Sequence, residues 1–135
     1  MNINQVVEFV EIVRDDRGKD IIFVKLEHGS LRVAIATDEQ CCEAFGYFDE
    51  QELYELPNMA GTTLKSVHHI DTLLEGHTMP HNPNPDERAG HCLFVKFVTS
   101  IDTFVVGVYS IHNGYYGHQV NTVYNPDVQT LQDLV

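Results

Sequence analysis

Hydrophobic and polar residues alternate in short runs along most of this chain, which is the pattern of β-strands that bury one face against a core. Leu31, Val33 and Ile35 give the clearest case, because the residues between them are small or charged. The same pattern predicts strands over residues 5–14, 20–27, 31–36, 62–71, 91–100, 103–111 and 117–124. The short gaps between consecutive runs favour antiparallel neighbours, so the first three strands should form a meander.

Turn residues separate the predicted strands. The sequence DDRGKD at 15–20 and the residues His28-Gly29-Ser30 supply the Asp and Gly residues that tight connections need. Ile101-Asp102 forms a short connection between two strongly apolar strands. Asn113-Gly114 is a hairpin signal before the last predicted strand, and it suggests that the last two strands pair with each other.

One segment breaks the alternation and predicts a helix. Residues 50–56 can form one or two helical turns, with Asp49 as the N-cap and Pro57 as the stop. The expected fold class is therefore α+β, a mainly antiparallel sheet of about six or seven strands with one short helix.

The length of the chain suits one folded domain. A chain of 135 residues with a hydrophobic content of 43% can bury a sizeable core. We expect a single domain over residues 1–135, with residues 125–135 as a docking helix or a frayed tail. Because the chain has no basic leader and no run of about 18 to 20 apolar residues, we expect a soluble, cytoplasmic protein without membrane attachment.

The charge is strongly negative and unevenly distributed. Twenty Asp and Glu residues against eight Lys and Arg residues give a net charge of −12, which should repel nucleic-acid phosphates. No Lys or Arg occurs from Val33 to Leu64. We expect a protein-binding acidic face there, made of Asp38, Glu39, Glu43, Asp49, Glu50, Glu52 and Glu55. The alternative is that this charge serves only solubility.

The candidate chemical groups are poorly spaced for catalysis or metal binding. His68-His69 and His91-Cys92 are neighbours on predicted strands and should point to opposite faces, whereas zinc ligands are usually separated by about two to four residues. Carboxylates near Cys41-Cys42 disfavour a reactive thiolate, and the odd set of three cysteines favours free thiols. We therefore expect no metal, no cofactor and no catalytic residue, with a thiol- or metal-dependent enzyme as an alternative.

An aromatic turn near the C-terminus gives a second binding hypothesis. Its candidate ligand-binding residues are His112, Asn113, Tyr115, Tyr116 and His118. Tyr115 and Tyr116 could stack on the base of a small nucleotide, but few basic residues are available to hold its phosphate. The simpler interpretation is a hairpin turn whose tyrosines pack against the edge of the sheet.

Two stretches resemble a small, uncharacterised family of phage and bacterial proteins. They are Asp38-Glu39-Gln40-Cys41-Cys42-Glu43, after the third predicted strand, and Asn113-Gly114-Tyr115-Tyr116, before the last one. The resemblance implies a phage or mobile-element origin and brings no catalytic residue with it. Together with the acidic face, it leads to the hypothesis of a non-enzymatic, anti-defence inhibitor, as anti-CRISPR proteins are. Its partner would be the basic surface of a host defence or nucleic-acid-handling complex. The sequence leaves a homo-oligomer open.

Overall fold

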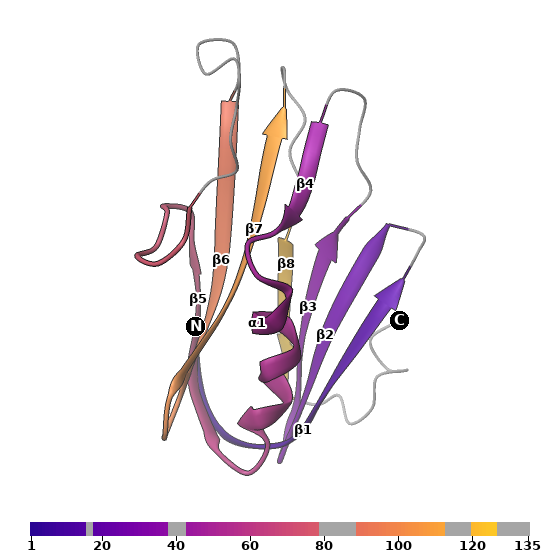
Figure 1. The fold of residues 1–135 in the computed structure, drawn as a ribbon. Helices are drawn as coiled ribbons and strands as arrows, with labels where there is room; N and C mark the ends of the chain where they lie inside the picture. The colour runs from indigo at the N-terminus through magenta and orange to yellow at the C-terminus, as the bar shows by residue number, and fades with distance from the viewer. Residues whose placement is uncertain (16–17, 38–42, 79–88, 113–119, 127–135) are drawn as a thin grey trace.

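The computed structural model describes residues 1–15, 18–37, 43–78, 89–112 and 120–126. Within them, eight strands form one antiparallel sheet in the order β4-β7-β6-β5-β1-β2-β3-β8 (Figure 1). The strands are β1 (Asn2–Asp15), β2 (Lys19–Leu26), β3 (Gly29–Ala36), β4 (Glu43–Tyr47), β5 (Thr63–Ile70), β6 (Ala89–Thr99), β7 (Thr103–His112) and β8 (Val120–Asn125). A short helix, α1 (Glu50–Glu55), continues into a 3₁₀ turn (Leu56–Met59). The predicted α+β class is confirmed.

Strand β1 is shared by two parts of the sheet. Residues 2–6 pair with β5, whereas residues 7–15 pair with β2, and the register slips once in each ladder. Asn4 adopts a φ of 55°, a left-handed conformation that asparagine tolerates better than most residues. Figure 1 shows β1 curving around the bottom of the molecule. The sheet thereby divides into a first half-sheet, β4-β7-β6-β5, and a second half-sheet, β1-β2-β3-β8.

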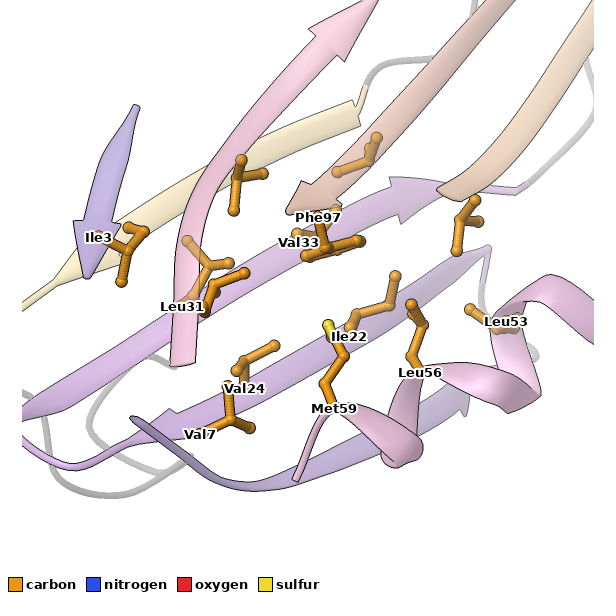
Figure 2. Close-up of a cluster of buried hydrophobic side chains, with 14 of the residues drawn as sticks. Ile3, Val7, Ile22, Val24, Leu31, Val33, Leu53, Leu56, Met59 and Phe97 are labelled. Atoms are coloured by element: carbon orange, nitrogen blue, oxygen red, sulfur yellow. The ribbon is translucent and has the colours of Figure 1, made fainter. Parts of the chain in front are cut away.

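The two half-sheets enclose one hydrophobic core. Ile22, Val24 and Val33 point into it from β2 and β3, and Phe97 joins the same cluster from β6 (Figure 2). The helical segment contributes Leu53, Leu56 and Met59, which are fully buried in this cluster. Burial of each aliphatic side chain stabilises the fold by roughly 1.5–3 kcal/mol. The helical segment is therefore part of the core rather than an appendage to it.

Side-chain hydrogen bonds join the two half-sheets. The Tyr47 hydroxyl of β4 donates to Asp20 of β2 over 2.7 Å. The His69 ring of β5 is bonded to the Thr122 hydroxyl of β8 over 2.6 Å. Strands at both ends of the sheet order, β4 and β8, thus contact the opposite half-sheet through polar groups.

Seven of the observed strands coincide with predicted ones, and β4 is the strand that alternation did not reveal. Its sequence, EAFGY, is short and includes Gly46, which lacks a side chain to pack and weakens any local strand preference. β4 forms because it pairs with the end of β7, from Glu43 opposite His112 to Tyr47 opposite Val108. The described residues thus contain one strand more than the seven that alternation predicts.

The expected pairing of the last two strands is wrong. β8 pairs with β3, from Ser30 opposite Asn125 to Ile35 opposite Val120. The physical reason is that both edges of β7 are already occupied, one by β6 and the other by β4. Asn113-Gly114, the basis of the expectation, lies outside the described residues.

The predicted helix is confirmed. The Asp49 carboxylate accepts a hydrogen bond from the Gln51 amide over 2.9 Å, as an N-cap does. The α-helix ends at Glu55, and Pro57 lies inside the 3₁₀ turn that follows. In the part of the chain that the structure describes, no helix is long and apolar enough to cross a membrane.

Replacing Leu56 by Ala should lower the free energy of unfolding by about 2–5 kcal/mol, because the side chain is fully buried between the half-sheets. Urea denaturation measures this change. The matched control is Glu55→Ala, an exposed neighbour whose loss should change the stability by no more than about 0.5 kcal/mol. Similar effects of the two substitutions would contradict a core role for the helical segment.

Candidate functional site

Helix α1 presents carboxylates to two hollows on different faces. Glu50 and Tyr54 are four residues apart and share one face, while Glu52 and Glu55 share another. Leu53 lies between these faces and is buried in the core. Helical periodicity therefore divides the acidic residues of α1 between two environments.

The first hollow, which we call the Arg14 cleft, has a volume of about 580 Å³. Strands β1, β2 and β4 line it together with α1. Its charged and aromatic lining includes Arg14, Asp15, Asp20, Tyr47, Glu50 and Tyr54. Three carboxylates against one guanidinium make this lining negative, and aromatic rings form part of its walls.

Arg14 contacts side chains from three other elements of the cleft. Its Nε lies 2.9 Å from Asp20 Oδ2, and its Nη1 donates to the Tyr54 hydroxyl over 2.8 Å. Nη2 lies 3.4 Å from Glu50 Oε1, and the guanidinium carbon lies 5.4 Å from the centre of the Tyr47 ring. One cation thus connects the β1–β2 hairpin with β4 and α1.

Asp20 is the buried carboxylate of the cleft, with 4% of its side chain exposed. Arg14 and the Tyr47 hydroxyl both bind Oδ2. Burial raises the pKa of Tyr47 well above its ordinary value, and the hydrogen bond to Asp20 raises it further. Tyr47 is therefore a hydrogen-bond donor rather than a proton-transfer group at neutral pH.

The second hollow, which we call the His77 hollow, has a volume of about 300 Å³ and is lined by residues that include Glu52, Glu55 and His77. His77 Nε2 lies 2.7 Å from Glu52 Oε2. The other carboxylate oxygen, Oε1, accepts a hydrogen bond from the Gly107 amide over 3.2 Å. Glu52 is thus occupied by contacts within the domain.

Gly107 permits an aromatic cluster beside this hollow. Phe48 stacks on Phe94 with ring centres 5.1 Å apart, and the His77 ring meets Phe94 edge-on at 4.7 Å. A Cβ atom at position 107 would lie 2.4 Å from the Phe94 ring and 2.9 Å from Phe48. The absence of a side chain at position 107 therefore makes room for the rings that hold His77.

The His77 pKa is raised above its ordinary value. Burial, the largest single influence, lowers it, but the hydrogen bond and the charge of Glu52 together with the Glu75 carbonyl outweigh burial. The Glu75 carbonyl oxygen lies 3.3 Å from Nδ1, so both ring nitrogens face acceptors. This arrangement favours the imidazolium form.

A model of a protein family, the domain of unknown function DUF7448, matches residues 3–122. The chain belongs to this family. The match runs from β1 into β8 and includes both hollows, and it confirms the expected membership of an uncharacterised family. No curated protein and no solved structure matches the chain.

The DUF7448 domain distributes the predicted acidic face unevenly. Glu50 and Glu55 are exposed, Asp49 caps α1, and Glu52 turns inward to His77. Glu43 belongs to β4, and Asp38 and Glu39 lie outside the described residues. The structure thus brings Glu50 to the Arg14 cleft and separates it from Glu52.

The predicted aromatic turn falls largely outside the described residues of the DUF7448 domain. His112 is the last residue of β7. Asn113, Tyr115, Tyr116 and His118 are not among the residues that the structure describes. The nucleotide hypothesis therefore gains no geometry from this turn.

Arg14, Asp20, Tyr47, Tyr54 and His77 also line the two hollows, and the sequence analysis assigned none of them to a binding site. A signal for the first two was present, because a hairpin at 15–20 places Arg14 opposite Asp20. The four-residue spacing of Glu50 and Tyr54 was a second signal. No local pattern connects His77 with Glu52, since 25 positions separate them.

The cysteine and histidine candidates are dispersed in the described part of the domain. The Cys92 thiol contacts the Asp71 carbonyl at 3.7 Å, and burial and the Asp71 charge raise its pKa, which disfavours a thiolate. His68 contacts Ser66, whereas His69 contacts Thr122. Cys41 and Cys42 lie outside the described ranges, and within those ranges no three His, Cys, Asp or Glu side chains gather around a common point.

Replacing Tyr47 by Phe should lower the free energy of unfolding by about 2 kcal/mol, because it removes a hydrogen bond to a buried carboxylate. Tyr54→Phe is the matched control. Its hydroxyl contacts the partly exposed Arg14, and its loss should change the stability by no more than about 0.5 kcal/mol. Equal losses in urea denaturation would contradict a special role for the Tyr47–Asp20 bond.

The His77–Glu52 pair should make the stability depend on pH. Because the folded-state pKa of His77 is raised, the pair stabilises the fold fully below the unfolded-state pKa of about 6.5. This contribution is lost as the pH rises through the folded-state pKa. The gap in unfolding free energy between the wild type and His77→Gln should therefore narrow as the pH is raised from about 6 to about 9.

The control for this pH series is His28→Gln, which changes an exposed histidine in the β2–β3 turn. Its stability should follow that of the wild type at every pH. A gap for His77→Gln that stays constant or widens with pH would contradict the assignment.

Proposed function

We propose that this DUF7448 domain is a non-enzymatic binding protein that docks a basic protein surface on the mouth of the Arg14 cleft. The observation that carries the proposal is the position of Tyr54, which is 51% exposed beside Glu50 at a cleft that also contains Asp15 and Asp20. An exposed aromatic ring among carboxylates is suited to anchor a cationic partner.

The cleft offers several contacts to a basic side chain of a partner. Glu50 is exposed at its mouth, and the buried carboxylate of Asp20 is one of its lining residues. The rings of Tyr47 and Tyr54 can contact the aliphatic part of a Lys or Arg side chain or its cationic end. A volume of about 580 Å³ leaves room for such a side chain.

Long-range electrostatics supports the same class of partner. The net charge of −12 and the absence of Lys and Arg from Val33 to Leu64 would attract a basic surface and speed its association. We propose a groove that normally holds nucleic acid, in a host defence or nucleic-acid-handling complex, as the surface that this domain occupies. The domain would then be an inhibitor of phage origin.

The polar groups of the hollows support binding rather than catalysis. Arg14 and Asp20 are paired with each other, as are His77 and Glu52, and each pair ties separate elements of the fold together. The residues exposed at the surface of the cleft, Glu50 and Tyr54, are of types suited to contact a partner.

The double substitution Glu50→Gln and Tyr54→Ala should abolish the recovery of a basic partner from a lysate of cells in which the protein occurs. With the recovered partner, the dissociation constant should rise by roughly tenfold or more, and its dependence on salt should weaken. Capture with the tagged domain, followed by binding measurements at several salt concentrations, tests both effects.

The matched control is Glu27→Gln, which removes one negative charge at the opposite end of β2 from Asp20. This variant should bind nearly as well as the wild type. Recovery of no basic protein, or equal recovery by all three forms, would exclude the proposed function.

A further inference from the structure

The outer face of the second half-sheet contains two buried polar atoms without a partner, Ser30 Oγ and Arg32 Nε. Both belong to β3, where Leu31 and Val33 between and beyond them point into the core. Alternation therefore directs Ser30 and Arg32 together to the opposite face, roughly 7 Å apart along the strand. Ser30 is fully buried.

A buried Arg32 Nε without a partner is unusual in a chain this acidic. The chain has 20 carboxylates for 8 Lys and Arg residues. Arg14 pairs with Asp20, and the Lys25 ammonium lies 3.1 Å from Glu8. Among the described residues, Arg32 Nε is a buried donor that has no hydrogen-bond partner. Leaving a buried guanidinium N–H without an acceptor costs free energy that a bound acceptor would recover.

The neighbours of these two residues define the chemistry of the face. Lys25 pairs directly with Ser30 in the register of β2 and β3, and its ammonium forms an ion pair with Glu8. Arg32 lies between Phe23 of β2 and Val123 of β8. Thus a guanidinium and a hydroxyl, which are both hydrogen-bond donors, lie beside the Lys25–Glu8 ion pair and the apolar residues Phe23 and Val123.

Two apolar side chains on this face, Phe9 and Val123, reach the surface. Phe9 pairs with Lys25 and is 46% exposed, and Val123 pairs with Arg32 and is 38% exposed. An exposed ring and an exposed aliphatic side chain therefore border the polar centre. A ligand that satisfies Arg32 could also cover them.

We propose that Arg32 and Ser30 form a site for an oxyanion, a carboxylate or phosphate group, attached to an apolar body. The guanidinium offers two parallel N–H donors to two oxygens, and the Ser30 hydroxyl offers a third donor. The apolar body of the ligand packs on Phe9 and Val123. Arg14 and Asp20 belong to the core-facing side of the same half-sheet, so this site is independent of the proposed function.

The test follows the Nε–H resonance of Arg32 in ¹⁵N-correlated spectra of the intact protein. Inorganic phosphate, acetate and phenyl phosphate are added separately at constant ionic strength, with chloride as the reference ion. A saturable shift of this resonance with phosphate or acetate supports the site and tells the two kinds of oxyanion apart. Phenyl phosphate should bind several-fold more tightly than inorganic phosphate, and equal affinities would remove the apolar part of the proposal.

Variants separate the site from general charge effects. Arg32→Gln should weaken binding by roughly tenfold or more, and Arg32→Lys, which keeps the charge but loses the paired donors, should also weaken it. Lys65→Gln, an exposed residue of β5, should leave binding unchanged. No saturable shift with any of the three probes in the wild type, or equal weakening in Lys65→Gln, would overturn the proposal even if Arg32→Gln does not fold.

Discussion

Strand β1 pairs with β5 along its first residues and with β2 along the rest, and the other features of the domain depend on this change of partner. A flat sheet of eight strands would leave the apolar faces of β2, β3, β6 and β7 open to water. The bend in β1 brings these faces together around one core, which buries Ile22, Val33, Phe97 and their neighbours. Asn4, in its left-handed conformation, lies in the pairing segment where this bend occurs.

The helical segment packs against the core between the two half-sheets and also bonds to the backbone of β7. β4 ends at Tyr47, and the Phe48 amide donates to the Gly107 carbonyl over 3.0 Å before the chain enters α1. Because β4 has ended here, the Gly107 amide would lack a partner if Glu52 did not accept its hydrogen bond. A carboxylate that the sequence assigns to an acidic surface therefore completes the hydrogen bonding of β7.

The sequence predicts a structural feature well when residues close to it in the chain determine that feature. Alternation reveals strands with one buried face, and the Asp49 cap is encoded within three residues. The pairing of β8 with β3 follows instead from β4 filling the free edge of β7, a strand too short and too irregular to recognise. Charge counting grouped Glu50 with Glu52, although helical periodicity already separates them. The attachment of Glu52 to His77 and Gly107 required the folded chain.

The pairing of β8 with β3 has a consequence for how the chain is made. Ser30 pairs with Asn125, so the edge of β3 stays unpaired until residues 120–125 have been synthesised. Strands β1 to β3 can assemble early as local hairpins, but their open edge is then a template on which other nascent chains could add a strand. β8 closes that edge, so a translation product that stops before β8 would expose an unpaired strand on which aggregation can start.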